Sequence, residues 1–554
     1  MACVYGYRQG DSGIPVIDMN ENDGGRYKLC YEAIGKLHRE HARKPMAYLQ
    51  VGRVPGIAMP RSDGEDWVST LSGCLHRVSP KVPEFDEEGL AEFALEVFKR
   101  FLNPLDYDEI KPFEEFLKVM KKPQEFKNEI RAYHQNRITD FMMEFQRECA
   151  SFVKAEAYMT WKHSRIISGN SKKMFRWDTQ SYYSRIIKSM EEKIYDKLPG
   201  LVKHMTPHQR AELVQELGDH YVKTICDYSS YEASFTKDKM HSVQFVLYEY
   251  MLSNFPKKTT QAIIDLISGE NKMVFDKFIF YVFARKMSGD ADTALSNALD
   301  NWVDWLYLLH KKGVPPDQAA RMLLVEGDDN ASCIENHVLQ VKDFEKLGLK
   351  AKLESGLELE ATGLCQLYVG PANVRKHIVI NKDPWKALAS MSVIPQKYGR
   401  AGAKCLKSLW RGQAQGMLYQ HAGAPVTSVL AAKVLELTRG VNVREKHWKE
   451  VVGYHQDEQA IRKSNWRELA NVEIDMADRV LVENQFGMTV EMQLYIEQLI
   501  RDWDGGNLHV PVEWFPPEWS AFSDLYVTPN AQPEWVQPLT KRRKELLDQF
   551  LAGL

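Results

Sequence analysis

The chain has 554 residues, a length that predicts two or more packed units rather than a single domain. Hydrophobic residues make up 44% and charged residues 27%, as in ordinary globular proteins, and no stretch approaches the roughly 18 uncharged apolar residues of a membrane span. The formal net charge of −3 argues against a uniformly basic nucleic-acid-binding surface. Between Lys154 and Lys203, however, basic residues outnumber acidic ones, and this segment is either a local RNA-binding face or a merely solvated surface.

The cysteine pattern and the N-terminus bear on the compartment. Eight cysteines are scattered along the chain without a C-x-x-C pair, which argues against zinc ribbons and against a disulfide framework. The first residues lack the basic and then apolar pattern of a secretory signal. We therefore expect the protein in a cytosol.

Hydrophobic periodicity predicts the order of the elements. The first 90 residues are rich in Gly, Pro and polar residues and indicate loops with short strands. Helices are then predicted from about Glu87, at 113–120, at 125–155, at 181–197 and from Pro207, which follows Thr206 as in a helix start. Short strands alternate with helices between 221 and 370, and helices dominate after 370.

A pair of adjacent aspartates lies in a predicted hairpin. Residues 321–326 indicate a buried strand that enters the turn 327–330, and residues 331–334 can return as its partner. Gly327 and Asn330 suit such a turn because both tolerate positive φ. Adjacent carboxylates repel each other, which favours a bound cation. For this trio alone, an ordinary Asp-rich turn is the alternative.

A second acidic group lies upstream, where residues 221–226 indicate a strand that delivers Asp227, before an amphipathic helix around 240–251. If the two strands are neighbours, Asp227 and Asp328 can hold two Mg²⁺ ions roughly 3.5–4 Å apart. One ion would lower the pKa of an attacking hydroxyl, and the other would neutralise a leaving pyrophosphate. Hard oxygen ligands with room for water and phosphate suit Mg²⁺.

A polar helix face is predicted between the two acidic groups. Ser288 and Gly289 open a long helix that is expected to reach about His310. Thr293 and Asn297 are four residues apart and share one face, from which they could recognise a ribose hydroxyl. A capped helix without such a role is the alternative.

The three groups together resemble a known set of motifs. Asp227-x₄-Glu232, Ser288-Gly-x₃-Thr293-x₃-Asn297 and Gly327-Asp328-Asp329 resemble motifs A, B and C of RNA-dependent RNA polymerases, in that order. Residues 152–166, with Lys154-x-Glu156 and Lys162-x-x-Arg165, are similar to motif F of the tombusvirus-like and nodavirus-like positive-strand RNA viruses. Residues 341–350 resemble motif D, and residues 364–367 resemble motif E, the turn that grips the primer strand.

The resemblance implies an α+β fold of the right-hand polymerase type. Fingers, palm and thumb would surround an antiparallel palm sheet, with helix-rich fingers and thumb. The implied layout is an N-terminal extension with fingertips at 1–90, fingers at 91–215, a palm at 216–370 with a fingers insertion at about 252–286, and a thumb and C-terminal region at 371–554.

The resemblance also implies residue roles. Asp227, Asp328 and Asp329 would be catalytic and would bind two Mg²⁺ ions, for which Mn²⁺ can substitute. The implied nucleotide-binding residues are Lys154, Lys162 and Arg165 for the triphosphate, and Glu232, Ser288, Thr293 and Asn297 for the ribose. A general acid for pyrophosphate is expected from motif D, with Lys350 as the first choice and Lys346 and Lys352 as alternatives.

Three positions depart from the family pattern. Glu232 stands where motif A usually ends in Asp, and it is expected to pair with Asn297 near the 2′-hydroxyl. Asp292 stands where motif B usually carries Asn, and Ala294 where Ser is common. None of the three is a metal ligand, so the departures bear on sugar selection rather than on activity.

The predicted function is template-directed RNA synthesis for viral genome replication and transcription. Its partners would be an RNA template, nascent RNA, ribonucleoside triphosphates and other viral replicase proteins. The expected location is the host cytoplasm, where attachment to a membrane-associated replication complex would need a partner. Two alternatives stay open: a reverse transcriptase, whose sugar gate would be a bulky aromatic near motif A, and a non-catalytic RNA-binding replicase scaffold, which would need no metal ligands.

Overall fold

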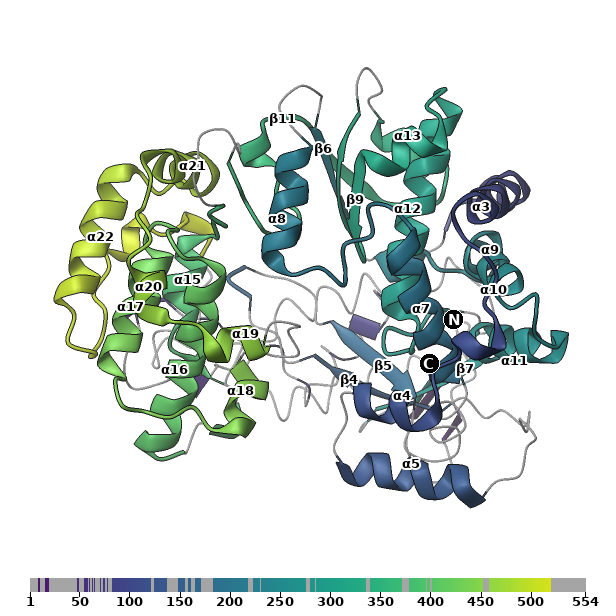
Figure 1. The fold of residues 1–554 in the computed structure, drawn as a ribbon, viewed down its shortest axis with the longest axis horizontal. Coiled ribbons are helices and arrows are strands. Elements are labelled where there is room, and N and C mark those ends of the chain that lie inside the picture. Colours follow the sequence, from purple (N-terminus) through teal and green to yellow (C-terminus); the bar gives the residue numbers. More distant parts are fainter. Residues whose placement is uncertain are drawn as a thin grey trace.

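The structure is a computed structural model that combines helices with small sheets in three bodies (Figure 1). It describes residues 8–9, 15–18, 47–48, 54–57, 59, 62, 64, 70, 73–74, 77, 82–120, 124–136, 148–154, 158–160, 165–170, 183–217, 223–229, 231–275, 279–283, 285–334, 339–370, 378–394, 396–398, 401–451 and 458–519. The predicted mixed helix-and-sheet class is therefore confirmed.

A four-stranded antiparallel sheet occupies the upper centre of Figure 1. Its strands, in spatial order, are β11 (Ala351–Leu357), β6 (Lys223–Tyr228), β10 (Asp329–Cys333) and β9 (Leu323–Glu326). Cys226 of β6 lies opposite Asn330 of β10 and opposite Leu353 of β11, so β6 is a central strand. This register brings both predicted acidic groups to one end of the sheet.

Helices pack beside this sheet around the largest hydrophobic core. They are α3 (Glu87–Phe101), α7 (Ser184–Lys197), α9 (Lys237–Ser242), α10 (Gln244–Met251), α12 (Thr293–Lys311), α13 (Pro316–Arg321) and α14 (Val341–Glu345). Helix α8 (Pro207–Glu216) belongs to a separate, smaller cluster that also contains side chains of β9 and β10. Trp302 and Trp305 of α12 are fully buried with Phe98 and Tyr248 in this core. Burial of such large aromatic side chains contributes strongly to the stability of this body.

Helix α12 is buried on all sides. Its predicted apolar face lies in the core, but the opposite face, which carries Asn297, Asp300, Asn301 and Asp304, is buried as well. Lys239 makes a fully buried ion pair with Asp304. The helix ends at Lys311, and Gly313 follows in the left-handed region at φ +88°.

A six-stranded mixed sheet lies below in Figure 1. Its strands, in spatial order, are β1 (Arg8–Gln9), β2 (Pro15–Asp18), β8 (Ile279–Phe283), β7 (Glu270–Val274), β4 (Glu148–Val153) and β5 (Ile166–Asn170), and nearby helices are α4 (Phe113–Val119), α5 (Gln124–Asn136) and α11 (Lys257–Ser268). The predicted helix at 125–155 is therefore confirmed up to Asn136 and wrong at 148–153, while residues 137–147 lie outside the described part of the chain. Residues 148–153 form a strand because they pair with both β5 and β7, and such pairing overrides local preference.

A helical body forms the left side of Figure 1 and has its own hydrophobic core. It consists of α15 (Pro384–Ser390), α16 (Ala403–Gln420), α17 (Thr427–Leu437), α18 (Glu445–Val451), α19 (Glu458–Lys463), α20 (Trp466–Ala470), α21 (Met476–Phe486) and α22 (Val490–Asp502). Strand β12 (Val393–Ile394) pairs with β3 (Ala47–Tyr48), and Val54 and Ile57 belong to the same core. The N-terminal part of the chain is thus tied to the C-terminal body.

Local signals placed several helices correctly. Helix α3 begins at Glu87 as predicted, and α7 begins within three residues of the expected position. Thr206 and Gln209 form a reciprocal capping box at the start of α8, with Pro207 in the first turn. The helix predicted after Asp227 is instead two helices, α9 and α10, which are separated at Val243. Across the described residues, no helix combines the length and apolar character needed to cross a bilayer.

Candidate active site

The turn between β9 and β10 presents two adjacent carboxylates at the edge of the sheet. Gly327 and Asp328 form the turn, and Asp329 is the first residue of β10. Gly327 has φ +64°, whereas an added Cβ there would meet nothing within 4 Å, so backbone conformation rather than space favours glycine. The predicted turn 327–330 is too long. Asn330 pairs with Val325 in the ladder, because two residues with glycine first already close a hairpin.

Asp227 reaches the same edge from the neighbouring strand. It lies inside β6, one residue before the strand ends, and not just after the strand as predicted. The register Cys226–Asn330, continued by one pair, places Asp227 opposite Asp329. Residues opposite each other in an antiparallel pair project to the same face. The structure therefore brings Asp227, Asp328 and Asp329 together.

The electrostatics of these carboxylates reflect their crowding. Burial raises the pKa of Asp328, and the nearby charges of Glu232 and Asp227 add to this effect, while Arg165 opposes it. Burial and the charge of Asp328 raise the pKa of Asp329 to about 6. A cation at this edge would relieve the repulsion, because it favours the charged form of each carboxylate.

The donor set fits Mg²⁺ in chemistry. Among the described residues, no three His, Cys, Asp or Glu side chains converge into a ready-made metal cage. Mg²⁺ does not need one, since it is usually held by one or two carboxylates together with waters and substrate phosphates. Asp227 and Asp328 offer such a pair of hard oxygen ligands, and both residues keep exposed surface through which a hydrated ion can reach them, although neighbouring protein atoms desolvate the Asp328 carboxylate enough to raise its pKa.

A buried hydrogen-bond network positions the two strand ends. Asn301 of α12 donates from Nδ2 to the carbonyl of Gly327 (3.1 Å). Its Oδ1 accepts from the Tyr228 hydroxyl (3.0 Å) and from Nδ2 of Asn330 (3.2 Å). The Trp305 indole N–H donates to the Tyr228 hydroxyl (3.1 Å). One side chain of α12 thus links the aspartate turn to the residue after Asp227. Sequence reasoning missed Asn301, although it lies one helical turn after Asn297 on the same face.

Glu232 is held by an arginine that sequence reasoning did not select. It lies in the short turn Tyr231–Ser234, and its carboxylate is 2.7 Å from a guanidinium nitrogen of Arg77, with both side chains mostly buried. Burial would raise the pKa of Glu232, but the charges of Arg77 and Arg165 outweigh burial and lower it. Among the described residues no hydrogen bond joins Glu232 to Asn297, and Arg77 holds the carboxylate; the pairing expected near a 2′-hydroxyl stays a prediction.

The predicted ribose-recognition residues gather at the start of α12. The Ser288 hydroxyl donates to the carbonyl of Ile166 (3.3 Å), and the Thr293 hydroxyl donates to the carbonyl of Met287 (2.9 Å). Asn297 is 6% exposed, and within the described part of the chain its Oδ1 has no hydrogen-bond partner. A buried acceptor without a partner is costly, so this atom would gain from a hydrogen-bond donor.

Asp292 is a structural residue at the start of α12. It is fully buried, makes an ion pair with Lys286 and accepts a hydrogen bond from the Tyr248 hydroxyl. Burial alone would raise the pKa of Asp292, but the charge of Lys286 outweighs it and lowers the pKa. The departure from Asn at this position is therefore accompanied by a buried cation six residues earlier.

The predicted phosphate-binding residues are only partly described. Arg165 is exposed and lies near enough to Asp328 and Glu232 to lower the pKa of both, and its carbonyl accepts from the backbone N–H of Lys154 (2.9 Å). Lys162 lies outside the described residues. The basic segment before Lys203 is partly neutralised, because Lys193 pairs with Glu109 and Lys197 with Asp196.

Of the three candidate general acids, only Lys352 lies on β11 (Ala351–Leu357). Lys352 is directly opposite Asp227, whereas Lys350 lies two residues away, where its carbonyl accepts from the N–H of Ser229 (2.9 Å). Lys346 is near Asp343 instead (3.8 Å). The register thus favours Lys352 over the first choice from the sequence.

The segment expected to grip a primer forms a tight turn. Cys365 and Gln366 both have positive φ, 53° and 62°, and Leu364 bridges to Leu367 across the turn. The Cys365 thiol donates to Glu326 of β9 (3.1 Å), and Glu326 also pairs with Arg210. The turn is therefore attached to the strand that leads into Asp328.

Comparison with protein families and with curated proteins identifies no relative of this chain. None of the protein-family models matches the chain, and a search of curated proteins finds no match.

Proposed function

We propose that the protein is an RNA-dependent RNA polymerase with a right-hand architecture. In this proposal the four-stranded sheet is the palm, the six-stranded sheet belongs to the fingers, and the helical body from α15 to α22 is the thumb. Its partners would be an RNA template, the nascent strand, ribonucleoside triphosphates and other viral replicase proteins in the host cytoplasm.

The main support is the meeting of Asp227, on β6, with Asp328, in the turn that leads into the neighbouring antiparallel strand β10, with Arg165 nearby. These residues come from three separate segments of the chain. The sequence resemblance implies a role in nucleotidyl transfer for each of them. A non-catalytic scaffold would gain nothing from mutually repelling carboxylates, which cost free energy unless a cation is bound. This juxtaposition favours catalysis over the scaffold.

Asp227 and Asp328 would hold Mg²⁺, with Asp329 as a supporting carboxylate. When bound, the metal supplies charge stabilisation for a hydroxyl nucleophile and a pyrophosphate leaving group. Arg165 would bind phosphate oxygens with its planar fork. Most of the acceleration would come from positioning and from charge stabilisation in the site.

Sugar recognition would use the polar start of α12. Asn297 Oδ1 would accept a hydrogen bond from a ribose hydroxyl, which would satisfy an acceptor that lacks a partner among the described residues. Arg77 would hold Glu232 beside this position. Lys352, or Lys350 beside it, would donate a proton to pyrophosphate.

The test is incorporation of labelled ribonucleotides on a defined RNA template with Mg²⁺ or Mn²⁺. Asp328→Ala should abolish product, while Asp317→Ala, which removes an exposed carboxylate on α13, should leave it unchanged. A folded wild-type chain that binds RNA but makes no product with either metal would favour the scaffold. Equal or better use of deoxyribonucleotides would favour a reverse transcriptase.

A further inference from the structure

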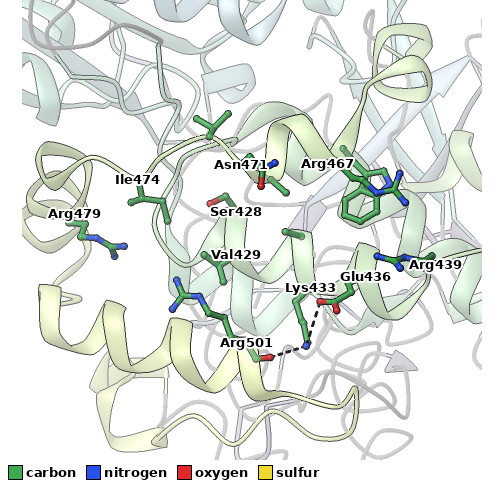
Figure 2. Close-up of a pocket in the computed structure, with 14 residues that line it drawn as sticks. Ser428, Val429, Lys433, Glu436, Arg439, Arg467, Asn471, Ile474, Arg479 and Arg501 are labelled. Carbon is green, nitrogen blue, oxygen red and sulfur yellow. Dashed lines mark hydrogen bonds and ion pairs between the residues drawn. The ribbon is translucent and has the colours of Figure 1, made fainter.

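A pocket of about 690 Å³ lies in the helical body, away from the aspartate turn, between α17, α20, α21 and α22. Figure 2 shows Arg439 and Arg467 on one side, Arg479 and Arg501 on the other, and Lys433 between them. Glu436 is the one acidic residue that lines this pocket. The volume is typical of sites for small molecules.

The positive charge on one side lacks nearby compensation. Arg467 stacks on the Trp466 ring, 4.9 Å from its centroid, and Arg411 lies over the same ring at 5.9 Å. Burial and the charge of Arg467 lower the pKa of Arg411, which shows that the two guanidinium groups are close enough to repel. Among the described residues, neither Arg467 nor Arg439 pairs with a carboxylate.

The other side has one carboxylate for two arginines. Glu497 is fully buried and accepts two hydrogen bonds from Arg479 (2.9 and 3.0 Å), one from Arg501 (3.1 Å) and one from the N–H of Val426 (3.0 Å). Lys433 contacts Glu436 at 3.6 Å and donates to the carbonyl of Arg501 (2.8 Å). The pocket therefore keeps an excess of positive charge even after its ion pairs with Glu436 and Glu497 are counted.

The remaining wall is partly apolar. Val429, Ala432 and Ile474 line it beside the polar side chains of Ser428 and Asn471. A ligand that fits would carry several negative charges at one end and a flat, partly apolar group with hydrogen-bonding edges at the other. Arginine forks bind phosphate oxygens in pairs, which favours phosphate over other anions.

We propose that this pocket binds a nucleoside triphosphate, with the phosphates at Arg439 and Arg467 and the nucleoside against the apolar wall. The site is separate from the proposed catalytic site, because none of the residues that line it belongs to the sheet that carries Asp227 and Asp328. Binding here does not depend on polymerase activity.

The experiment measures binding of ATP and of inorganic tripolyphosphate to the full chain by calorimetry, in EDTA so that no divalent metal supports a catalytic site. Arg439→Ala/Arg467→Ala should weaken both ligands at least tenfold. Lys404→Ala/Lys463→Ala removes two exposed charges from the same body and should change neither. Ala432→Leu should weaken ATP but leave tripolyphosphate within about threefold, since it fills the apolar wall only.

Unchanged ATP affinity in the double arginine variant would overturn the proposal. The proposal would also be overturned if the double arginine variant lost binding to a 12-nucleotide RNA but kept its binding of ATP. The pocket would then bind an RNA strand rather than a nucleotide. Asp328→Ala should retain ATP binding in EDTA, which separates a failure of this proposal from a failure of the polymerase proposal.

Discussion

The buried pair of Asp292 and Lys286 allows a sharp test of the reasoning about the start of α12. Asp292→Asn restores the residue that motif B usually carries, and it keeps the shape of the side chain. In this protein, however, it would leave the fully buried ammonium group of Lys286 without its counter-charge. Removing one partner of a buried ion pair typically costs about 3–5 kcal/mol. The return to the family pattern should therefore destabilise this body.

Hydrogen exchange measured by mass spectrometry can follow the effect within α12 itself. A loss of about 3–5 kcal/mol corresponds to exchange faster by about two to four powers of ten for amides that exchange when this body opens. Lys286→Met/Asp292→Asn should recover much of the protection, because it removes both charges. Asp317→Asn, in an exposed pair with Arg100, should cost less than about 1 kcal/mol.

The pH dependence has a defined sign. The pKa of Asp292 is lowered in the folded protein, so its contribution is complete above the unfolded-state value of about 3.9 and is lost as pH falls below it. The penalty of Asp292→Asn should therefore be the same at pH 6 and pH 8. This account would be refuted if Asp292→Asn left the protection of α12 amides from hydrogen exchange unchanged at both pH values.

Three further changes test the site. Arg77→Ala should raise the use of deoxyribonucleotides relative to ribonucleotides about tenfold, measured as the ratio of kcat/KM values, because Glu232 loses the arginine that holds it. An unchanged ratio would contradict this role of Arg77. Asn301→Leu should lower the free energy of unfolding, measured in urea, by about 2–3 kcal/mol and should slow RNA synthesis, because Gly327, Tyr228 and Asn330 each lose a hydrogen-bond partner. Full activity of this variant would count against the network. Lys352→Met should lower single-turnover rates about 100-fold and Lys350→Met much less, and the reverse order would return the general acid to Lys350.

Local patterns were sufficient for much of the fold. The start of α3, the capping box of α8 and the end of α12 before Gly313 are each specified by residues within a few positions of one another. The aspartate turn was also predictable, because glycine before two aspartates between two apolar segments is typical of a hairpin. Its length was not, since the sequence allows Asn330 either in the turn or opposite Val325, and the structure has it in the ladder of the hairpin.

Contacts between distant segments account for the errors. Residues 148–153 form a strand only because β5 and β7 lie on either side, and no local signal separates them from the preceding helix. Arg77 and Glu232 meet from segments more than 150 residues apart, so no local signal pointed to this ion pair. The polar face of α12 was predicted only in part, because an Asn or Asp on a helix looks the same whether it faces water or a buried partner.

The pairing of β3 with β12 has a consequence for the order of folding. Ala47 and Tyr48 leave the ribosome early, but their partners Val393 and Ile394 follow only after roughly 350 further residues. At about 5–20 residues per second, the first strand waits on the order of 20–70 seconds for the second. All four strands of the antiparallel sheet are made before then, since β11 ends at Leu357. Residues 47–48 therefore cannot pair with β12 until the sheet is able to close, which makes the docking of β3 a late step of biosynthesis.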